Sequence, residues 1–213
     1  MIKKSTLNPL PLTLTPREGF TMIELLVVVA IMAIISGTLV SFSRIGHDQV
    51  TLYVEASKVI DVILRSKSLA ISAYRDPDVS RVTCAHGLSI DLASDPGKFS
   101  LNRYLKKLQP DPSIPVPLCA NIGSSTSIIS NYDRVVAERG EYVLSRNVVF
   151  DASETTAADI VFRPPDPQIY FFAPDGTKLR ASSSSIVVKN KNGSGRIRIT
   201  VGQGGQVAYN FID

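Results

Sequence analysis

The chain has 213 residues, of which 20% are charged, and a formal net charge of +4. This length suits one folded domain beside a membrane segment, and the small positive charge argues against a broad nucleic-acid-binding surface. With only two histidines and two cysteines, the sequence offers no zinc-ligand pattern and no Ser-His-Asp or Cys-His arrangement. We therefore expect no metal, no cofactor and no enzymatic activity.

The first feature in chain order is an apolar segment behind a basic flank. Lys3, Lys4 and Arg17 precede it, with Glu18 as the one acid. The segment runs from Phe20 to Phe42, which is 23 residues. As a helix it would extend about 34 Å, enough to cross a bilayer. The flanking cations predict a cytoplasmic N-terminus, a single pass through the membrane and an extracytoplasmic remainder.

One carboxylate, Glu24, interrupts this apolar run. A charge at bilayer depth costs roughly 2.5 to 3.5 kcal/mol, so Glu24 needs a partner. The run also begins with Gly19-Phe20, at a fixed distance before the acid. Together these residues resemble the class III signal of type IV prepilins and type II secretion pseudopilins.

The resemblance implies that residues 1–19 are a leader, which a prepilin peptidase removes by cutting between Gly19 and Phe20 before Phe20 is methylated. Glu24 would then be the fifth residue of the mature chain and would neutralise the N-terminal amine of a neighbouring subunit. Such a pair would set the register of a filament, as buried polar groups do in coiled coils. The implied partners are other pilin or pseudopilin subunits, the peptidase, an inner-membrane assembly platform and membrane lipid.

Two other interpretations of the segment remain open. A secretory signal peptide could be cut near Ser41 and Ser43, although its apolar core would be unusually long and Glu24 would be unexplained. A membrane-anchored globular protein unrelated to filaments would require that Gly19 is never cut.

The helical pattern continues beyond Phe42, over residues 43–75. Apolar residues keep to one face: Leu52, Ala56, Val59, Ile63 and Ala70. Charged residues occupy another: Glu55, Lys58, Asp61 and Arg65. This predicts an amphipathic helix that ends near Arg75, because Asp76-Pro77-Asp78 is a stop signal.

Residues 76–213 consist of short apolar stretches separated by Gly, Pro, Asn and Ser, which predicts an antiparallel β-rich head. We expect strands at 81–84 and 88–92 that pair across Ala85-His86-Gly87. An irregular insertion should cover 95–140, with a Pro-rich tract at 110–117, a Ser-rich tract at 124–130, and one short helix. That helix would carry Arg103, Lys106 and Lys107.

Further strands are predicted at Glu141–Phe150, Ile160–Phe162, Gln168–Phe172, Ser185–Lys189 and Arg196–Val201. Turns should fall at 173–176 and 190–195, where Pro, Asn and Gly occur. The expected fold class is α+β: a long N-terminal helix, its first half transmembrane, packed on an antiparallel sheet as in type IV pilins.

The last 50 or so residues add to the resemblance. The patterns Ile169-Tyr170-Phe171-Phe172-Ala173-Pro174-Asp175-Gly176 and Gly195-Arg196-Ile197-Arg198 are similar to the C-terminal domain of H-type pseudopilins and FimT-like minor pilins. The function implied is that of a minor pilin or pseudopilin, a structural subunit of a type II secretion pseudopilus or a type IV pilus.

An alternative function rests on Arg196 and Arg198. In some FimT-like minor pilins a similar motif is associated with DNA binding, and arginines two apart on a strand lie on one face, about 6.6 Å apart. The alternative is therefore a DNA-binding minor pilin of a competence pilus. The simpler interpretation of these arginines is a solvated strand face.

The remaining candidates are structural. Cys84 and Cys119 would lie in a compartment that permits oxidation, so a disulfide is favoured over two buried thiols. Asp151, Glu154 and Asp159 could form a calcium cluster, but their spacing fits no binding loop.

Overall fold

The computed structural model describes residues 19, 21–72, 81–107, 119, 132–164, 168–193 and 195–212. It divides into two compact units, Met1–Ser43 and Arg44–Asp213, and helix α1 (Met22–Ile71) contributes to both. The expected helix end at Arg75, the stop signal at 76–78 and the tracts at 110–117 and 124–130 lie outside the described residues. The predicted long N-terminal helix is confirmed, because α1 runs through 50 residues without interruption.

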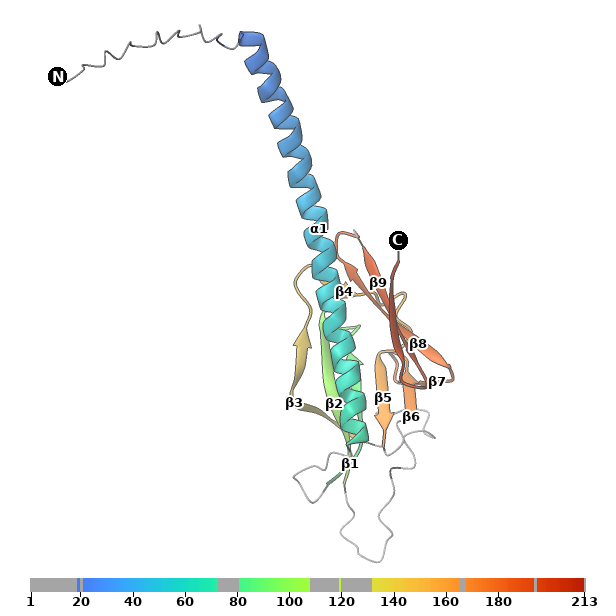
Figure 1. The fold of residues 1–213 in the computed structure, drawn as a ribbon. Coiled ribbons are helices and arrows are strands. Elements are labelled where there is room, and N and C mark those ends of the chain that lie inside the picture. The colour runs from blue at the N-terminus through green and yellow to red at the C-terminus, as the bar shows by residue number, and fades with distance from the viewer. Residues whose placement is uncertain are drawn as a thin grey trace, which may run out of the picture. The chain divides into compact units, whose positions relative to one another are not determined.

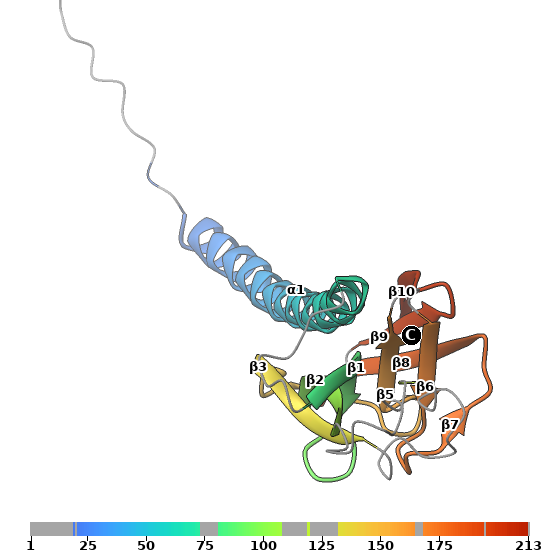
Figure 2. The ribbon, with the colours of Figure 1, turned by 90° about the horizontal axis from the view of Figure 1, so that it is seen from below.

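In the second unit, α1 packs one face against the strands (Figures 1 and 2). The predicted apolar face is confirmed, because its members are at most 2% exposed: Leu52, Ala56, Val59, Ile63 and Ala70. The position of Glu55 was predicted wrongly. Glu55 is 4% exposed, since a residue three after Leu52 and four before Val59 lies on the same side of the helix as both.

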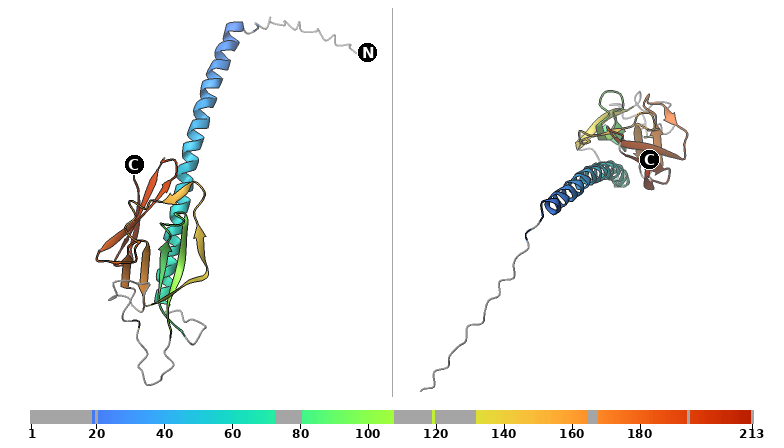
Figure 3. Two further views of the ribbon diagram at one scale, coloured as in Figure 1. Left: turned by 180° about the vertical axis from the view of Figure 1, so that it is seen from behind. Right: turned by 90° about the horizontal axis from the view of Figure 1, so that it is seen from above.

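Ten strands form two antiparallel sheets in the described residues, seen from behind and from above in Figure 3. The six-stranded sheet has the order β3-β2-β1-β5-β6-β7. Its strands are β1 (Arg81–Ile90), β2 (Lys98–Lys107), β3 (Asp133–Val143), β5 (Asp159–Arg163), β6 (Gln168–Phe172) and β7 (Lys178–Leu179). The four-stranded sheet has the order β10-β9-β8-β4, with β4 (Val148–Phe150), β8 (Ser183–Asn190), β9 (Arg196–Gly202) and β10 (Val207–Ile212).

Two apolar clusters hold the second unit together. The larger joins α1 to both sheets and includes Phe99, Phe162, Phe171 and Ile199. The smaller contains residues that alternate with those of the larger along β2, β5 and β6, and it includes Tyr104, Val161 and Phe172. Because successive residues of a strand point to opposite faces, the six-stranded sheet is covered on both faces over its middle strands.

The predicted hairpin across Ala85-His86-Gly87 is wrong, because β1 runs through these residues as one strand. Gly87 allows a close approach here: a Cβ at this position would lie 2.5 Å from Ile160 O and 3.1 Å from Tyr104 Cε2. A glycine inside a strand often marks a place where the backbone of a neighbouring strand approaches closely. The turn falls instead after Ile90, where Asp91 Oδ1 accepts hydrogen bonds from the N–H groups of Ala93 and Ser94.

The 95–140 region is more regular than predicted where it is described. Arg103, Lys106 and Lys107 lie on β2 and not on a short helix. Phe99 and Leu101 enter the larger cluster while Ser100 and Asn102 face the other side, so β2 has the period of a strand. β2 is held by pairing with β1 and β3. Local residue preferences do not predict such pairing, because it depends on residues elsewhere in the chain.

The C-terminal part follows the sequence closely. The strands predicted at 160–162, 168–172, 185–189 and 196–201 are all present, each within two residues of its expected ends. The turn at 173–176 is confirmed by a hydrogen bond of 2.9 Å from Gly176 N to Ala173 O, and Gly176 has a positive φ. The single strand predicted over Glu141–Phe150 is wrong, since a turn between Ser145 and Val148 separates β3 from β4.

Candidate functional site

The start of α1 is set by Thr21, which directly precedes the first helical residue, Met22. Thr21 Oγ1 accepts a hydrogen bond of 3.3 Å from Glu24 N–H, and Thr21 O accepts one of 3.2 Å from Leu25 N–H. This is the arrangement of an N-terminal cap, in which a side-chain oxygen takes up an otherwise unpaired N–H group of the first turn. Gly19 is exposed and outside the helix, whereas Phe20 lies outside the described residues.

Glu24 is exposed in the first turn of α1, where the partial positive charge of the helix N-terminus favours an anion. That effect is about 0.3 to 1 kcal/mol at an exposed site, much less than the penalty of a carboxylate in lipid. Among the described residues, the fold of one chain therefore places Glu24 and brings no cation to it.

The residues that follow form an apolar rod. Met22–Leu39 has a mean hydropathy of 2.4, and it is the one stretch of the described residues apolar enough and long enough to cross a membrane. Every side chain from Met22 to Leu39 is exposed in the chain itself. An apolar helix with no covered face requires lipid or other helices around it.

Residues 15–40 match the prokaryotic N-terminal methylation motif. This match supports a type IV pilin-like protein. The motif points to a structural subunit rather than an enzyme, and together with the apolar helix it fits a membrane-anchored pilin. It also suggests processing by a prepilin peptidase and assembly with other pilin subunits. No curated protein and no solved structure matched the chain.

In the second unit, Arg196 and Arg198 lie on β9, whose other face is buried. Both guanidinium groups pair with one acid: Arg196 with Glu154 Oε1, and Arg198 with Glu154 Oε2 at 3.0 Å. Sequence reasoning missed this pairing, because Glu154 precedes the two arginines by more than forty residues. A phosphate would have to compete with Glu154 for both arginines, so the DNA-binding alternative is not favoured.

The three acids considered for calcium each pair with cations of their own. Asp151 Oδ2 lies 2.9 Å from Lys189 Nζ, Glu154 contacts the two arginines, and Asp159 Oδ1 lies 3.4 Å from Arg134 Nη1. A hydrogen bond from the Ser153 hydroxyl, and then Lys189, lower the pKa of Asp151. The structure therefore places the three acids in separate ion pairs, and no group of metal-ligating side chains occurs in the described parts of the chain.

Cys84 and Cys119 form a disulfide in the structure, across a sequence separation of 35 residues. Cys84 is fully buried on β1, and Cys119 packs against the smaller apolar cluster. The bond thus attaches the chain between β2 and β3 to the strand in the middle of the six-stranded sheet.

Proposed function

We propose that this chain is a minor pilin or pseudopilin, a structural subunit of a type II secretion pseudopilus or a type IV pilus. In this proposal a prepilin peptidase cuts between Gly19 and Phe20, Phe20 is methylated, and the chain is held in the inner membrane by residues 20–42. An assembly platform then draws it into a filament with other subunits. The extracytoplasmic head, residues 76–213, then contacts the partners of the subunit.

One observation carries the proposal: the acid and the cleavage signal occur together at the start of a helix that is apolar on every side. The methylation motif covers Gly19, Phe20 and Glu24. The Thr21 cap starts the helix immediately after the proposed cut, so Glu24 lies in the first turn beyond the new N-terminus.

The physical role proposed for Glu24 follows from its energetics. A processed Phe20 carries an α-amino group that is cationic near neutral pH, and Glu24 carries the opposite charge. Pairing the two between neighbouring chains removes both charges from the apolar surroundings together. Since the pair forms at one axial offset only, it also fixes the step from subunit to subunit, while the apolar faces of α1 supply the cohesion.

The decisive experiment is mass spectrometry of the mature N-terminus. The chain is expressed in cells with an active prepilin peptidase and, as a control, in cells whose peptidase is inactive. The proposal predicts a mature chain that begins with methylated Phe20 in the first cells, and an intact leader in the second. A chain that keeps residues 1–19 in both would overturn the proposal, and so would a cut near Ser41.

A further inference from the structure

Strand β10 (Val207–Ile212) ends the four-stranded sheet and, among the described strands, pairs on one side only, with β9. The pairing is regular along the whole strand, without a bulge. Its six residues, Val-Ala-Tyr-Asn-Phe-Ile, include no charged residue, no proline and no glycine. An edge of this composition leaves its main-chain groups open to pairing with another chain.

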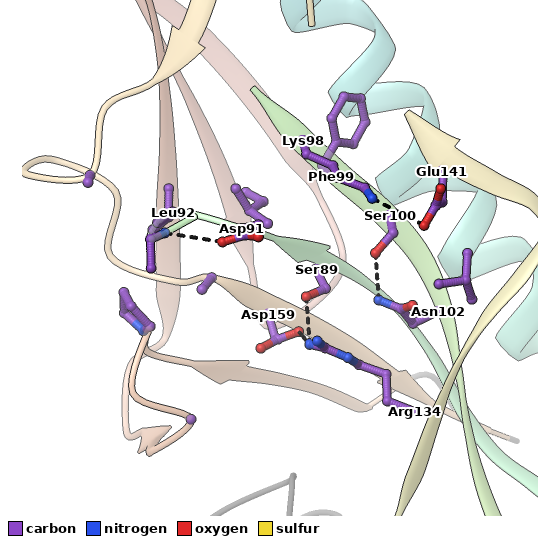
Figure 4. Close-up of a pocket in the computed structure, with 17 residues that line it drawn as sticks. Ser89, Asp91, Leu92, Lys98, Phe99, Ser100, Asn102, Arg134, Glu141 and Asp159 are labelled. Carbon is purple, nitrogen blue, oxygen red and sulfur yellow. Dashed lines mark hydrogen bonds and ion pairs between the residues drawn. The ribbon is translucent and has the colours of Figure 1, made fainter. Parts of the chain in front are cut away.

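The other three edges of the described sheets are protected in ways common to natural proteins. β7 has only two residues, one of them Lys178. On the outer side of β4, the Phe150 N–H group donates to Pro96 O at 2.7 Å, so the turn before β2 covers this side. The pairing of β3 with β2 contains a bulge, and β3 carries charged residues, two of them labelled in Figure 4: Asp133, Arg134, Glu138, Arg139 and Glu141. Of these described edges, β10 alone has neither charge, bulge nor cover.

The hydrogen bonds of the β9–β10 hairpin show which main-chain groups of β10 face outward. Gly202 N–H donates to Gln206 O at 3.0 Å, so these two residues form a hydrogen-bonded pair at the start of the ladder. In an antiparallel ladder such pairs alternate with pairs that are not hydrogen-bonded. The N–H and C=O groups of Val207, Tyr209 and Phe211 therefore point away from β9, to an edge that no other described strand occupies.

The side chains beside this edge are aromatic or apolar, and they are exposed. Tyr209 is 47% exposed and Phe211 56%. The Tyr209 ring meets that of Tyr53 on α1 edge to face, with centroids 5.8 Å apart, and the two hydroxyl groups lie 3.2 Å apart. Val50, one turn earlier on α1, is exposed as well. An added strand with apolar side chains at alternate positions would cover this surface, whereas charged side chains would lose hydration there.

The direction of β10 argues against a second copy of the same strand as the occupant. Lys67 Nζ donates to Gly205 O, and Tyr53 contacts Tyr209, so β10 runs antiparallel to α1. Two β10 strands paired antiparallel across a two-fold axis would place the two α1 helices in opposite directions. Copies that are anchored by α1 in one membrane share one direction. In the proposed topology, the occupant is therefore a different protein.

Two features define this occupant. The outward main-chain groups select an extended chain, because a strand matches their spacing along the edge, and the surface beside them selects apolar residues at every second position. We propose that the free edge of β10 binds an extended segment of another protein as an added strand, hydrogen-bonded to Val207, Tyr209 and Phe211. This peptide site goes beyond the proposed role in a filament, and only the exclusion of a second copy rests on that role.

The test uses the full chain in lipid nanodiscs and hydrogen-exchange mass spectrometry with fragmentation that resolves single residues. The probe is a short peptide of alternating valine and threonine between terminal lysines, acetylated and amidated. At about ten times its Kd, it should slow the exchange of the Val207, Tyr209 and Phe211 amides about tenfold. The amides of Ala208 and Asn210, which already face β9, should change less. The same peptide with methyl groups on every nitrogen between its lysines is blocked on both edges and should protect none of them.

Two variants at one position separate main-chain pairing from side-chain contact. Phe211→Ala removes the side chain only, whereas Phe211→Pro also removes an N–H group that β9 does not use. Phe211→Pro should bind the peptide about tenfold more weakly than Phe211→Ala. Val143→Ala, a change at another exposed apolar residue, should leave binding unaltered. Thermal unfolding checks that both Phe211 variants fold, and the methylated peptide tests the pairing without any variant.

Three results would overturn the proposal: no slowing at Val207, Tyr209 and Phe211 up to the solubility limit of the peptide, equal protection by the methylated peptide, or equal affinity of the two Phe211 variants. Slow exchange at these residues before the peptide is added, together with cross-linked dimers of the chain, would show a second copy on the edge and would overturn the assignment to another protein. None of these results depends on whether Gly19 is cut, so the proposal can fail while the proposed function stands, and the reverse.

Discussion

Thr21 Oγ1 accepts a hydrogen bond from the main-chain N–H of Glu24 at 3.3 Å, so the residue that caps α1 is bonded to the one acid of the apolar segment. The cap holds the first turn in helical form and fixes where Glu24 projects relative to Gly19. A filament contact made through Glu24 depends on this placement.

Replacing Glu24 with Val should leave membrane insertion intact or improve it, because a charge is removed from the apolar segment. Incorporation into filaments should fall at least about tenfold, which corresponds to 1.4 kcal/mol of lost pairing. The measurement compares the sheared filament fraction with the membrane fraction by immunoblot. Ile23→Val is the control, since it is a small change in the same turn that keeps both the acid and the Thr21 cap. Normal incorporation of Glu24→Val would contradict the proposed pairing.

Removing Lys58 should destabilise the head through Glu55. The Glu55 carboxylate is 5% exposed and lies 2.7 Å from Lys58 Nζ. Lys58→Ala would leave a buried charge without its cation, at a cost of about 1 to 3 kcal/mol in the free energy of unfolding, the range for an unsatisfied buried group. Glu55→Leu combined with Lys58→Leu should recover most of the loss. Urea unfolding of the parent chain, of Lys58→Ala and of the Glu55→Leu, Lys58→Leu double variant checks this. An unchanged midpoint for Lys58→Ala would show that the pair contributes little.

Adding a methyl group at Gly87 should strain the middle of the six-stranded sheet. Its Cβ would lie 2.5 Å from the main-chain oxygen of Ile160, which cannot move without disturbing the pairing of β1 with β5. Gly87→Ala should therefore lower the free energy of unfolding by about 1 to 3 kcal/mol. Gly195→Ala is the matched control, because its Cβ meets Leu52 Cδ2 at an ordinary 3.4 Å. Equal unfolding midpoints for the two variants would refute the crowding at Gly87.

Reduction of the Cys84–Cys119 disulfide should destabilise the head by roughly 3 to 4 kcal/mol, from the chain entropy of the loop it closes. Urea unfolding with and without a reducing agent measures the effect. The Cys84→Ala, Cys119→Ala double variant should unfold at the reduced midpoint and should not respond to the reducing agent. A parent chain whose midpoint is equally indifferent to reduction would show that the bond contributes nothing.

Acid should destabilise the head through His86. Burial, and secondly Arg103, lower the pKa of His86 to about 4, while an unfolded histidine titrates near 6.5. Between these values the unfolded chain binds the proton that the folded chain excludes, so stability falls as the pH drops from 6.5 towards 4, by about 3 kcal/mol in total. The free energy of unfolding of the parent minus that of His86→Gln, followed over this pH range, isolates the effect. A constant difference would rule it out.

The parts of the fold that local chemistry specifies were predictable from the sequence. The buried stripe of α1 follows the helical period, and the turn at 173–176 follows from a Pro and a Gly at the required positions. The same holds for β9, where Ile197, Ile199 and Val201 alternate with polar residues.

The errors arise where a residue type serves a distant contact. Gly87 signals a turn in sequence, yet it is needed because Tyr104 and Ile160 approach β1 closely. Glu55 is typical of a solvated face, but its carboxylate is buried and pairs with Lys58, which stays exposed. Arg196 and Arg198 suggest a phosphate contact in sequence, but both form ion pairs with Glu154, which is far away in sequence. For Gly87 and for the two arginines the deciding neighbour is set by tertiary pairing, which a local pattern does not contain.

The strand order of the six-stranded sheet has a consequence for biogenesis. β1 follows α1 directly in the chain but pairs on one side with β5, whose first residue, Asp159, comes almost seventy residues after Ile90. A head that emerges from the membrane N-terminus first would therefore hold a half-built sheet with an open edge until β5 has crossed. Open strand edges invite pairing with other chains, and late long-range pairing is slow. In the proposed topology, the interval between the export of β1 and the export of β5 would thus expose this unpaired edge to aggregation and to envelope proteases.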